Sequence, residues 1–414
     1  MIFKIKHKEK LGGTNVHCVQ NVTENIYWIG GNDRRLERFE NMFPIPKGVS
    51  YNSHLILDEK TMVMDTVDQA IRMQYLENIK YLLNGRDLDY LVVNHMEPDH
   101  CGNIEDLLKI YPNMKIVGNS KTFKFFEQFY NVSPSENYYE VKEGDVIDLG
   151  KHKIQFFNMP MVHWPEVMVA YEQTEKILFS ADAFGTFGAL NGNIFNDQVD
   201  FEGYYLSEAR RYYTNIVGKY GAQVQIALKK LSGLDIKIIA PLHGPIWRDN
   251  LEYLLDKYNK WSSYTPEKQG VVIVYGSMYG NTENAANCIA NKLAQQGVTD
   301  IKVYDVSKTH PSYIIADAWK YSNLVIASPT YNGGLYLVMD ALLHEMASLN
   351  FQNRKVSILG NYTWATGALA SIKERLSKMK DIEIIGNPLD INSSVKDNQE
   401  AALDEMVQEI VKSL

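Results

Sequence analysis

The chain has 414 residues, 45% apolar and 22% charged, which is the balance of a globular protein with more than one hydrophobic core. Its formal net charge of −8 argues against a surface for nucleic acid or for an anionic membrane. The three cysteines, Cys18, Cys101 and Cys288, include no CxxC pair, which excludes a disulfide framework, a zinc ribbon and a rubredoxin-type iron centre and indicates a reducing compartment. The basic residues 1–10 are not followed by an apolar secretory segment, and no run approaches the roughly 20 apolar residues of a membrane span, so we expect a cytoplasmic protein.

The first half of the chain mixes short β-rich segments with helical patterns. Segments such as NIYWIGG, LDYLVVN and KILFSAD are typical of strands, and helical periodicity is found at 71–84, 103–111 and 120–129. A further helix is expected near 248–261. The sequence therefore predicts a layered α/β domain over residues 1–262, followed by a polar linker with Pro and Gly over 263–270.

The second half is more regular. Five strand candidates, VVIVYGS, IKVYDVS, NLVIASPT, KVSILGN and IEIIGNP, alternate with helical stretches near 281–296, 311–319, 338–348, 366–379 and 397–413. Five alternating strand and helix units predict a doubly wound parallel five-stranded sheet over residues 271–414.

Ligands of such a sheet bind outside the carboxyl ends of the strands, so the loops there are candidates for a binding site. The loop SMYGNT joins the first strand to its helix and offers hydroxyls, a flexible Gly280 and free backbone N–H groups to a phosphate. The alternative is that Asn281 or Thr282 only caps the helix. The third and fourth strands end in SPTYNGG (328–334) and GNYTWATG (360–367), which place aromatic rings at the same edge, where a flat ring could be held.

Residues 271–414 resemble a flavodoxin, with SMYGNT matching the phosphate loop and the other two loops matching the segments that flank the flavin. The resemblance implies FMN as the cofactor. A dinucleotide is disfavoured because no GxGxxG follows a strand. The implied FMN-binding residues are Ser277, Met278, Tyr279, Gly280, Asn281, Thr282, Pro329, Thr330, Tyr331, Asn332, Gly333, Asn361, Tyr362, Trp364 and Gly367.

The segment NHMEPDH gathers four metal-binding side chains in one loop, namely His95, Glu97, Asp99 and His100. A single loop histidine is more often structural or solvated, but three further candidates follow strand-like segments in MVHWPE, FSADAF and PLHGP, namely His163, Asp182 and His243. Of these three only Asp182 could bridge two metals, because a carboxylate has two oxygens and a histidine in practice offers one nitrogen. Cys101 is expected to be a small buried residue rather than a thiolate ligand.

The first domain resembles the metallo-β-lactamase superfamily, an αββα sandwich whose usual first motif is HxHxDH. Here Glu97 replaces the second histidine, and a carboxylate oxygen in place of nitrogen favours iron over zinc. Together with the flavodoxin-like half, the pattern resembles the flavodiiron proteins over essentially the full chain. The resemblance implies one iron held by His95, Glu97 and His163, a second held by Asp99, His100 and His243, and Asp182 with a solvent oxygen bridging them.

The resemblance implies reduction of O2 to water, with electrons relayed through FMN, as the favoured reaction, and reduction of NO to N2O as the alternative. The electron donor is expected to be separate: a rubredoxin-like protein, a flavin reductase or a reduced deazaflavin. A head-to-tail homodimer or dimer of dimers would bring one chain's FMN to its neighbour's irons, and Trp164 would be either a contact to that flavin or a core residue. A zinc hydrolase fused to a flavodoxin and a pure electron carrier are the other classes considered.

Overall fold

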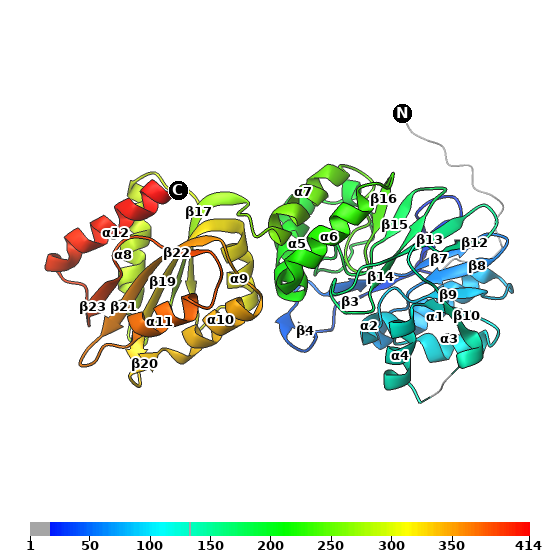
Figure 1. Cartoon of the computed structure of the whole chain (residues 1–414), viewed down its shortest axis with the longest axis horizontal. Coiled ribbons are helices and arrows are strands. Elements are labelled where there is room, and N and C mark those ends of the chain that lie inside the picture. The colour runs from blue at the N-terminus through cyan, green and yellow to red at the C-terminus, as the bar shows by residue number, and fades with distance from the viewer. Residues whose placement is uncertain (1–16, 132–133) are drawn as a thin grey trace.

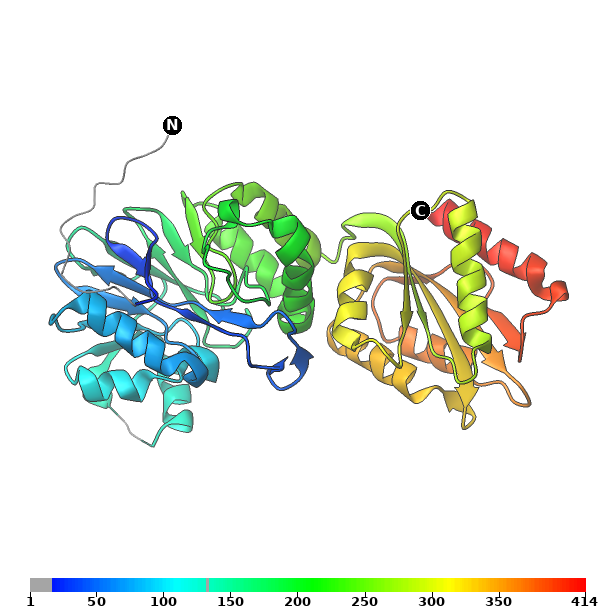
Figure 2. The ribbon, with the colours of Figure 1, turned by 180° about the vertical axis from the view of Figure 1, so that it is seen from behind.

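The computed structural model describes residues 17–131 and 134–414, and Figures 1 and 2 show these as two domains side by side. The chain passes from one domain to the other between α7 (Leu251–Ser262) and β17 (Lys268–Tyr275). The basic stretch 1–10, which bears on secretion, lies outside the described residues. Within the described ranges, none of the helices has the length and apolar character that a bilayer crossing requires.

The first domain is built on two main sheets. The strands of the first sheet, in spatial order, are β1 (Gln20–Asn21), β2 (Ile26–Trp28), β7 (His54–Leu57), β8 (Thr61–Met64), β9 (Tyr90–Val92), β10 (Lys115–Gly118) and β11 (Tyr138–Glu140). Those of the second sheet are β12 (Val146–Asp148), β13 (Lys153–Asn158), β14 (Met168–Glu172), β15 (Ile177–Phe179) and β16 (Ile238–Ala240). Two short ribbons, β3 (Gly31–Asp33) with β6 (Val49–Tyr51) and β4 (Arg38–Phe39) with β5 (Phe43–Pro44), complete the strands.

Helices cover the outer face of each sheet, which gives the expected αββα sandwich (Figure 1). Beside the first sheet lie α1 (Arg72–Leu83), α2 (Pro98–Cys101), α3 (Ile104–Ile110) and α4 (Ser120–Phe129). Beside the second lie α5 (Leu206–Tyr212), α6 (Gly221–Leu231) and α7. The helices expected near 71–84, 103–111, 120–129 and 248–261 are thus confirmed within three residues at each end.

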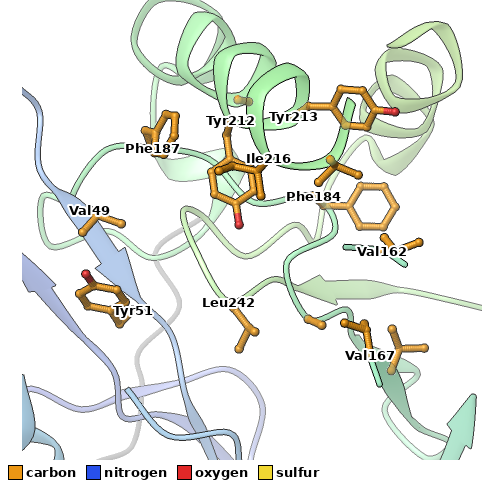
Figure 3. Close-up of a cluster of buried hydrophobic side chains, with 14 of the residues drawn as sticks. Val49, Tyr51, Val162, Val167, Phe184, Phe187, Tyr212, Tyr213, Ile216 and Leu242 are labelled. Atoms are coloured by element: carbon orange, nitrogen blue, oxygen red, sulfur yellow. The ribbon is translucent and has the colours of Figure 1, made fainter. Parts of the chain in front are cut away.

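The core between these layers reaches up to the loops that follow the strands. Figure 3 shows Tyr212, with Ile216 from the π-helical turn Tyr213–Val217, packed over the loop residues Phe184 and Phe187. Phe187 and Tyr212 meet edge to face with ring centroids 5.1 Å apart. These buried aromatic rings fix the loops that follow β15 and β16.

The second domain has the strand order expected of a flavodoxin-like fold, 2-1-3-4-5. Its strands, in spatial order, are β18 (Ile301–Asp305), β17, β19 (Tyr321–Tyr331), β21 (Arg354–Tyr362) and β22 (Ile382–Ile384), with β23 (Leu389–Asn392) also beside β21 and β20 (Gly334–Leu335) beside β19. Its helices are α8 (Asn281–Gln295), α9 (Pro311–Lys320), α10 (Leu337–Ser348), α11 (Ala368–Leu376) and α12 (Glu400–Ser413).

The continuous apolar run of β17 explains why this sheet is covered on both faces. Val271 and Ile273 belong to the core beneath α8 and α12, whereas Val272 and Val274 belong to the core beneath α9 and α10. Successive residues of a strand point to opposite faces, so a strand with no polar alternation must be buried on both sides. The strand begins at Lys268, inside the segment expected as linker.

Buried polar contacts join the two domains. The Trp319 indole donates to the carbonyl of Trp261 at 3.0 Å, and both rings are fully buried. Glu267 accepts from the Trp261 indole at 2.7 Å and pairs with Arg210 of α5. Burial opposes ionisation of Glu267, but Arg210, with Trp261 and Lys257, holds its pKa at about 2. The segment between the domains is therefore anchored by charge as well as by packing.

Candidate functional site

The seven candidate metal ligands come together at one edge of the αββα sandwich. His95 and Glu97 follow β9, and Asp99 and His100 lie in the short helix α2. The other three lie in the loops after β13, β15 and β16, namely His163, Asp182 and His243. All seven therefore lie in loops, or in the short helix α2, on a rigid scaffold.

The first group of candidate ligands is centred on a single point. The Glu97 Oε2 atom lies 3.2 Å from Nε2 of His95 and 3.2 Å from Nε2 of His163. The Asp182 Oδ2 atom lies 3.2 Å and 3.3 Å from the same two nitrogens. Four donor atoms from three loops thus surround one small volume.

The second group lies on the other side of Asp182. The Asp182 Oδ1 atom is 3.3 Å from His100 Nε2 and 3.6 Å from His243 Nε2. Asp99 Oδ2 lies 3.3 Å and 3.5 Å from these two nitrogens. Asp182 therefore directs one oxygen to each group, which is the arrangement of a bridging carboxylate.

These contacts fit a pair of metal ions better than a hydrogen-bond network. Bonds of roughly 2.1 Å to one metal place neighbouring ligand atoms roughly 3.0–3.4 Å apart, close to the 3.2–3.6 Å found here. His100 Nε2 and His243 Nε2 lie 3.0 Å apart, although two imidazole nitrogens that both accept would repel. Both carboxylate oxygens of Asp99 and of Asp182 are buried without a hydrogen-bond partner. Such buried acceptors need a cation.

Outer contacts set the orientation of two histidines. His95 Nδ1 lies 2.7 Å from Glu166 Oε1, which also accepts from the backbone N–H of Met96 at 2.9 Å. His243 Nδ1 lies 2.7 Å from the carbonyl of Ser50, so it must donate there. In both rings Nδ1 is thereby the protonated nitrogen, and Nε2 is left to bind a metal.

The loops that carry the candidate ligands are held in uncommon backbone conformations. Asp65 accepts from the backbone and side chain of Asn94, both at 2.7 Å, and fixes the start of the NHMEPDH loop. Ala181 and Phe184, on either side of Asp182, have φ values of 51° and 71°. Left-handed backbone at residues other than glycine is costly and gathers at functional sites.

The ionisable groups of the cluster shift one another's pKa values. Burial would lower the pKa of His163, but the adjacent carboxylates of Asp182 and Glu97 raise it to about 9. Burial acts in the same way on His100, and the charges of Asp99 and Asp182 raise its pKa to about 9. Before a metal binds, these imidazoles therefore hold protons at neutral pH, so metal loading releases protons.

The cluster opens to solvent on one side through a cavity of about 530 Å³. Glu97 and Asp99 line it, together with Glu40, Asn41 and Tyr51. Phe39 also lines it, and the Phe39 ring meets the His243 ring edge on at 5.3 Å. A small substrate or a neighbouring chain can reach the cluster from this side.

The three loops of the second domain lie next to one another because β17, β19 and β21 are adjacent strands. In the first loop, Ser277 Oγ accepts from the backbone N–H of Gly280, which has a φ of 88° and precedes α8. The first N–H groups of α8 have no partner inside the helix and face this loop. Hydroxyls and helix N–H groups together suit a phosphate.

The other two loops are fixed to each other. Thr330 Oγ1 accepts from the backbone N–H of Ala368 at 3.1 Å, and a Cβ on Gly367 would lie 2.5 Å from the carbonyl oxygen of Gly333. The large rings beside them are free of the core: Trp364 is 92% exposed and Tyr279 is 91% exposed. Exposed rings around a phosphate loop provide a surface on which a flat cofactor ring can stack.

Four more of the predicted residues lie in a turn and in strand ends beside these loops. Asn332 and Gly333 form the turn between β19 and β20, both with positive φ. Pro329 pairs with Asn361 in neighbouring strands, and the Asn361 amide donates to the carbonyl of Ser393 at 2.8 Å. The sequence-predicted loops are thus brought together at one sheet edge, in a different domain from the metal ligands.

Family models match both domains. Residues 49–244 match the ODP family β-lactamase model, and residues 273–405 match the flavodoxin model. The anaerobic nitric oxide reductase flavorubredoxin of Vibrio vulnificus is 32% identical over 367 residues, which cover 86% of this chain and 72% of that protein.

Solved structures agree over 95% of the chain. Rubredoxin oxygen:oxidoreductase from Desulfovibrio gigas has a TM-score of 0.88 at 28% identity and covers 95% of this chain and 98% of its own. A variant of the flavo di-iron protein from Thermotoga maritima has a TM-score of 0.86 at 26% identity, with coverage of 95% and 98%. This chain belongs to the flavodiiron protein family. The expected fold, a lactamase-like sandwich followed by a flavodoxin-like sheet, is confirmed.

Two residues of this flavodiiron protein were not foreseen from its sequence. Glu166 and Asp65 hold the NHMEPDH loop. Their partners Met96 and Asn94 lie 70 and 29 residues away in the sequence. The one available signal for Glu166 was an acid three residues after His163.

The interpretation of Cys101 as a small buried residue is confirmed: its thiol donates to the carbonyl of Met96, and burial raises its pKa to about 12. Trp164 is partly buried, with its ring edge on to that of His95 at 5.2 Å.

Proposed function

We propose that this flavodiiron protein reduces O2 to water at a di-iron centre, using electrons relayed through FMN. The observation that carries the proposal is the placement of Asp182, whose two oxygens face two separate groups of donor atoms. A single metal would leave one of these oxygens and one group of donors unused. The flavorubredoxin relative and the oxygen oxidoreductase neighbour are both oxidoreductases by name.

Each iron would have its own set of ligands. His95, Glu97 and His163 would hold one iron. Asp99, His100 and His243 would hold the other, with Asp182 between the two. Three carboxylates among seven donors form a hard, negatively charged set, which suits iron better than zinc and weighs against a zinc hydrolase.

When bound, two irons and one FMN supply up to four electrons, enough to take O2 to two waters. The chain itself orients the donors. Glu166 and Ser50 hold His95 and His243 with their Nε2 atoms toward the metals, and the rings of Phe39 and Tyr212 pack against His243. A preorganised site of this kind holds the donors in place without rearrangement when metal binds.

Reduction of two NO to N2O is the second candidate reaction. It needs two electrons, which the same cofactors supply, and the flavorubredoxin relatives from Vibrio vulnificus and Klebsiella pneumoniae are named as nitric oxide reductases. The seven candidate ligands do not separate the two gases, so both must be tested on one sample.

The FMN would lie in the second domain. Its phosphate would bind to Ser277, Thr282 and the first N–H groups of α8, and its ring would lie between the loops that carry Tyr331 and Trp364. A pure electron carrier would need this half alone and would leave the metal cluster without a role.

The proposal extends to assembly and partners. The flavin loops and the metal cluster lie in different domains, so a head-to-tail dimer, or a dimer of such dimers, would join one chain's FMN to its neighbour's irons. A rubredoxin-like protein, a flavin reductase or a reduced deazaflavin would supply the electrons.

Three free cysteines suit a cytoplasmic location. The two domains would act as units over 1–262 and 271–414, joined by residues 263–270.

The proposal is tested by counting cofactors and gases in the same sample. We expect about two irons and one FMN per chain, and consumption of O2, NO or both by the reduced protein. In Asp182→Asn the bridging charge is lost while side-chain volume is kept, so iron should fall to one per chain or less while FMN stays bound. Two zincs that support hydrolysis, with no gas consumption after iron loading, would overturn the proposal.

A further inference from the structure

A small apolar cavity lies against the loops that carry His163 and Asp182. It has a volume of about 20 Å³ and is lined by residues such as Val162, Val167, Val224 and Ala227. A volume of roughly 10–15 Å³ is enough for one water-sized molecule, so the cavity can hold one small guest. Figure 3 shows the side chains of Val162, Val167 and Phe184 gathered on this side of the domain.

The cavity gives a polar guest almost nothing to bond to. Only two of its lining residues, Ser180 and Tyr258, carry a polar side chain. The Ser180 hydroxyl already donates to the carbonyl of Ala183 at 2.8 Å, and the Tyr258 hydroxyl accepts from the backbone N–H of Phe184. Apolar cavities of this kind stay dry and take up xenon or other apolar guests.

The cavity touches the loops of two candidate ligands. Val162 directly precedes His163, and Ala183 directly follows Asp182. Val167 directly follows Glu166, which holds His95. The cavity is therefore lined by chain neighbours of two candidate ligands and of the residue that holds His95.

On its other side the cavity adjoins a groove that opens at the surface. The groove has a volume of about 470 Å³ and lies between α6, α7 and the strands β15 and β16. Its lining shares Phe184, Leu228 and Leu231 with the cavity, and Leu255 at its rim is 39% exposed. These three shared side chains are the only lining common to both spaces.

We propose that the groove and the cavity form an apolar entry route by which O2 or NO reaches the metal cluster from behind, past Leu228 and Phe184. The proposal rests on the proposed function, since it assigns a path to that function's gaseous substrate. Both gases are small and apolar and favour an apolar space over water. The cavity of about 530 Å³ beside Glu97 and Asp99 is lined by charged side chains and would be covered in a head-to-tail dimer. A second, apolar route would then give the gas access to the cluster.

The first test needs no turnover. Crystals of the whole protein held under xenon pressure should show xenon in the cavity beside Val162 and Ala183, because xenon occupies dry apolar cavities. In Val224→Phe or Ala227→Leu, which fill the cavity, that xenon should be absent. Two different filling variants are used because overpacking destabilises a core and one of them can fail to fold.

The second test is kinetic. In the filled variants kcat/KM for the gas should fall about tenfold while kcat at saturating gas stays near wild type, because a route limits capture and not chemistry. The matched control is Ile226→Phe, on the same helix but 65% exposed and outside both linings, which should keep wild-type kcat/KM. A merely structural effect would lower kcat or iron content instead.

The outcomes separate this inference from the proposed function. A wild-type cavity without xenon, or a filled variant with wild-type kcat/KM, overturns the entry route and leaves the proposed function standing. Wild-type protein with iron and FMN that consumes neither gas overturns the proposed function, whatever the xenon density shows.

Discussion

The contact between Glu166 and His95 offers a sharp prediction. Glu166 Oε1 accepts from His95 Nδ1 at 2.7 Å and from the backbone N–H of Met96 at 2.9 Å, and neither the Glu166 nor the His95 side chain is exposed. Glu166→Gln keeps an oxygen in place but removes the charge. A hydrogen bond to a charged group contributes about 1 kcal/mol more than one between neutral groups, and loss of such a partner weakens metal binding about 10-fold or more.

Glu166→Ala should cost more, because it leaves both donors without an acceptor in a buried place; we expect about 3 kcal/mol, roughly a 100-fold loss of iron affinity. The matched control is Glu172→Gln. Glu172 is also fully buried, and it accepts from His152 Nδ1 at 3.0 Å and from the backbone N–H of Thr174 at 2.9 Å, but outside the metal cluster.

Anaerobic competition for ferrous iron against a chelator, with unfolding followed on the same samples, measures both effects. Glu166→Gln and Glu172→Gln should lose similar stability, whereas only Glu166→Gln should lose iron affinity. If the two variants and the wild type hold iron equally tightly, Glu166 does not orient a ligand and the assignment of His95 is refuted.

Three further predictions address the metal, the domain junction and the assembly. Glu97→His restores an HxHxDH motif and should shift the bound metal from iron toward zinc while FMN is kept; a variant with full iron content and wild-type O2 reduction would contradict this. Glu267 has a folded pKa of about 2 against its usual 4.5, so its stabilisation, about 3 kcal/mol, is present above pH 4.5 and lost as the pH falls toward 2. Denaturant unfolding of Glu267→Gln should therefore show a deficit at pH 7 that shrinks in acid, and a deficit independent of pH would show that Arg210 does not hold the charge. A mixed dimer of an Asp182→Ala chain and a Trp364→Ala chain stripped of flavin should keep about half the activity, because one flavin and one metal site still meet across the interface; its complete inactivity, with each remaining cofactor bound, would mean transfer within a single chain.

Local patterns in the sequence were enough for the elements and the candidate ligands. The helix expected at 311–319 spans Pro311–Lys320, and the seven candidate metal ligands all meet in one cluster. Each of these follows from information within a few residues: apolar periodicity, or ligands that directly follow a strand. Among the three later candidates, Asp182 could be singled out as a possible bridge because it is the one carboxylate with two oxygens, and the family resemblance supplied the assignment.

Contacts between distant segments were not visible in the sequence. Glu166 looked like any acid near a proline until the fold brought it to His95, 71 residues away. Strand β23 follows the break at Pro388 and pairs with β21 beyond β22, which no local pattern distinguishes from a loop. The cavity behind His163 depends on side chains from several elements and has no signature in any one of them. Such features arise from tertiary packing, which periodicity does not encode.

The most direct test of the central claim is the number of electrons consumed for each O2. The reduced protein, loaded with iron and FMN, would be titrated anaerobically with known amounts of O2 while reductant, O2 and peroxide are measured together. If two metals share Asp182 and receive electrons from one flavin, four electrons should be consumed per O2. Water should then be the product, with no free peroxide. Two electrons per O2 with release of peroxide, or oxidation of the flavin alone while the iron stays reduced, would contradict it.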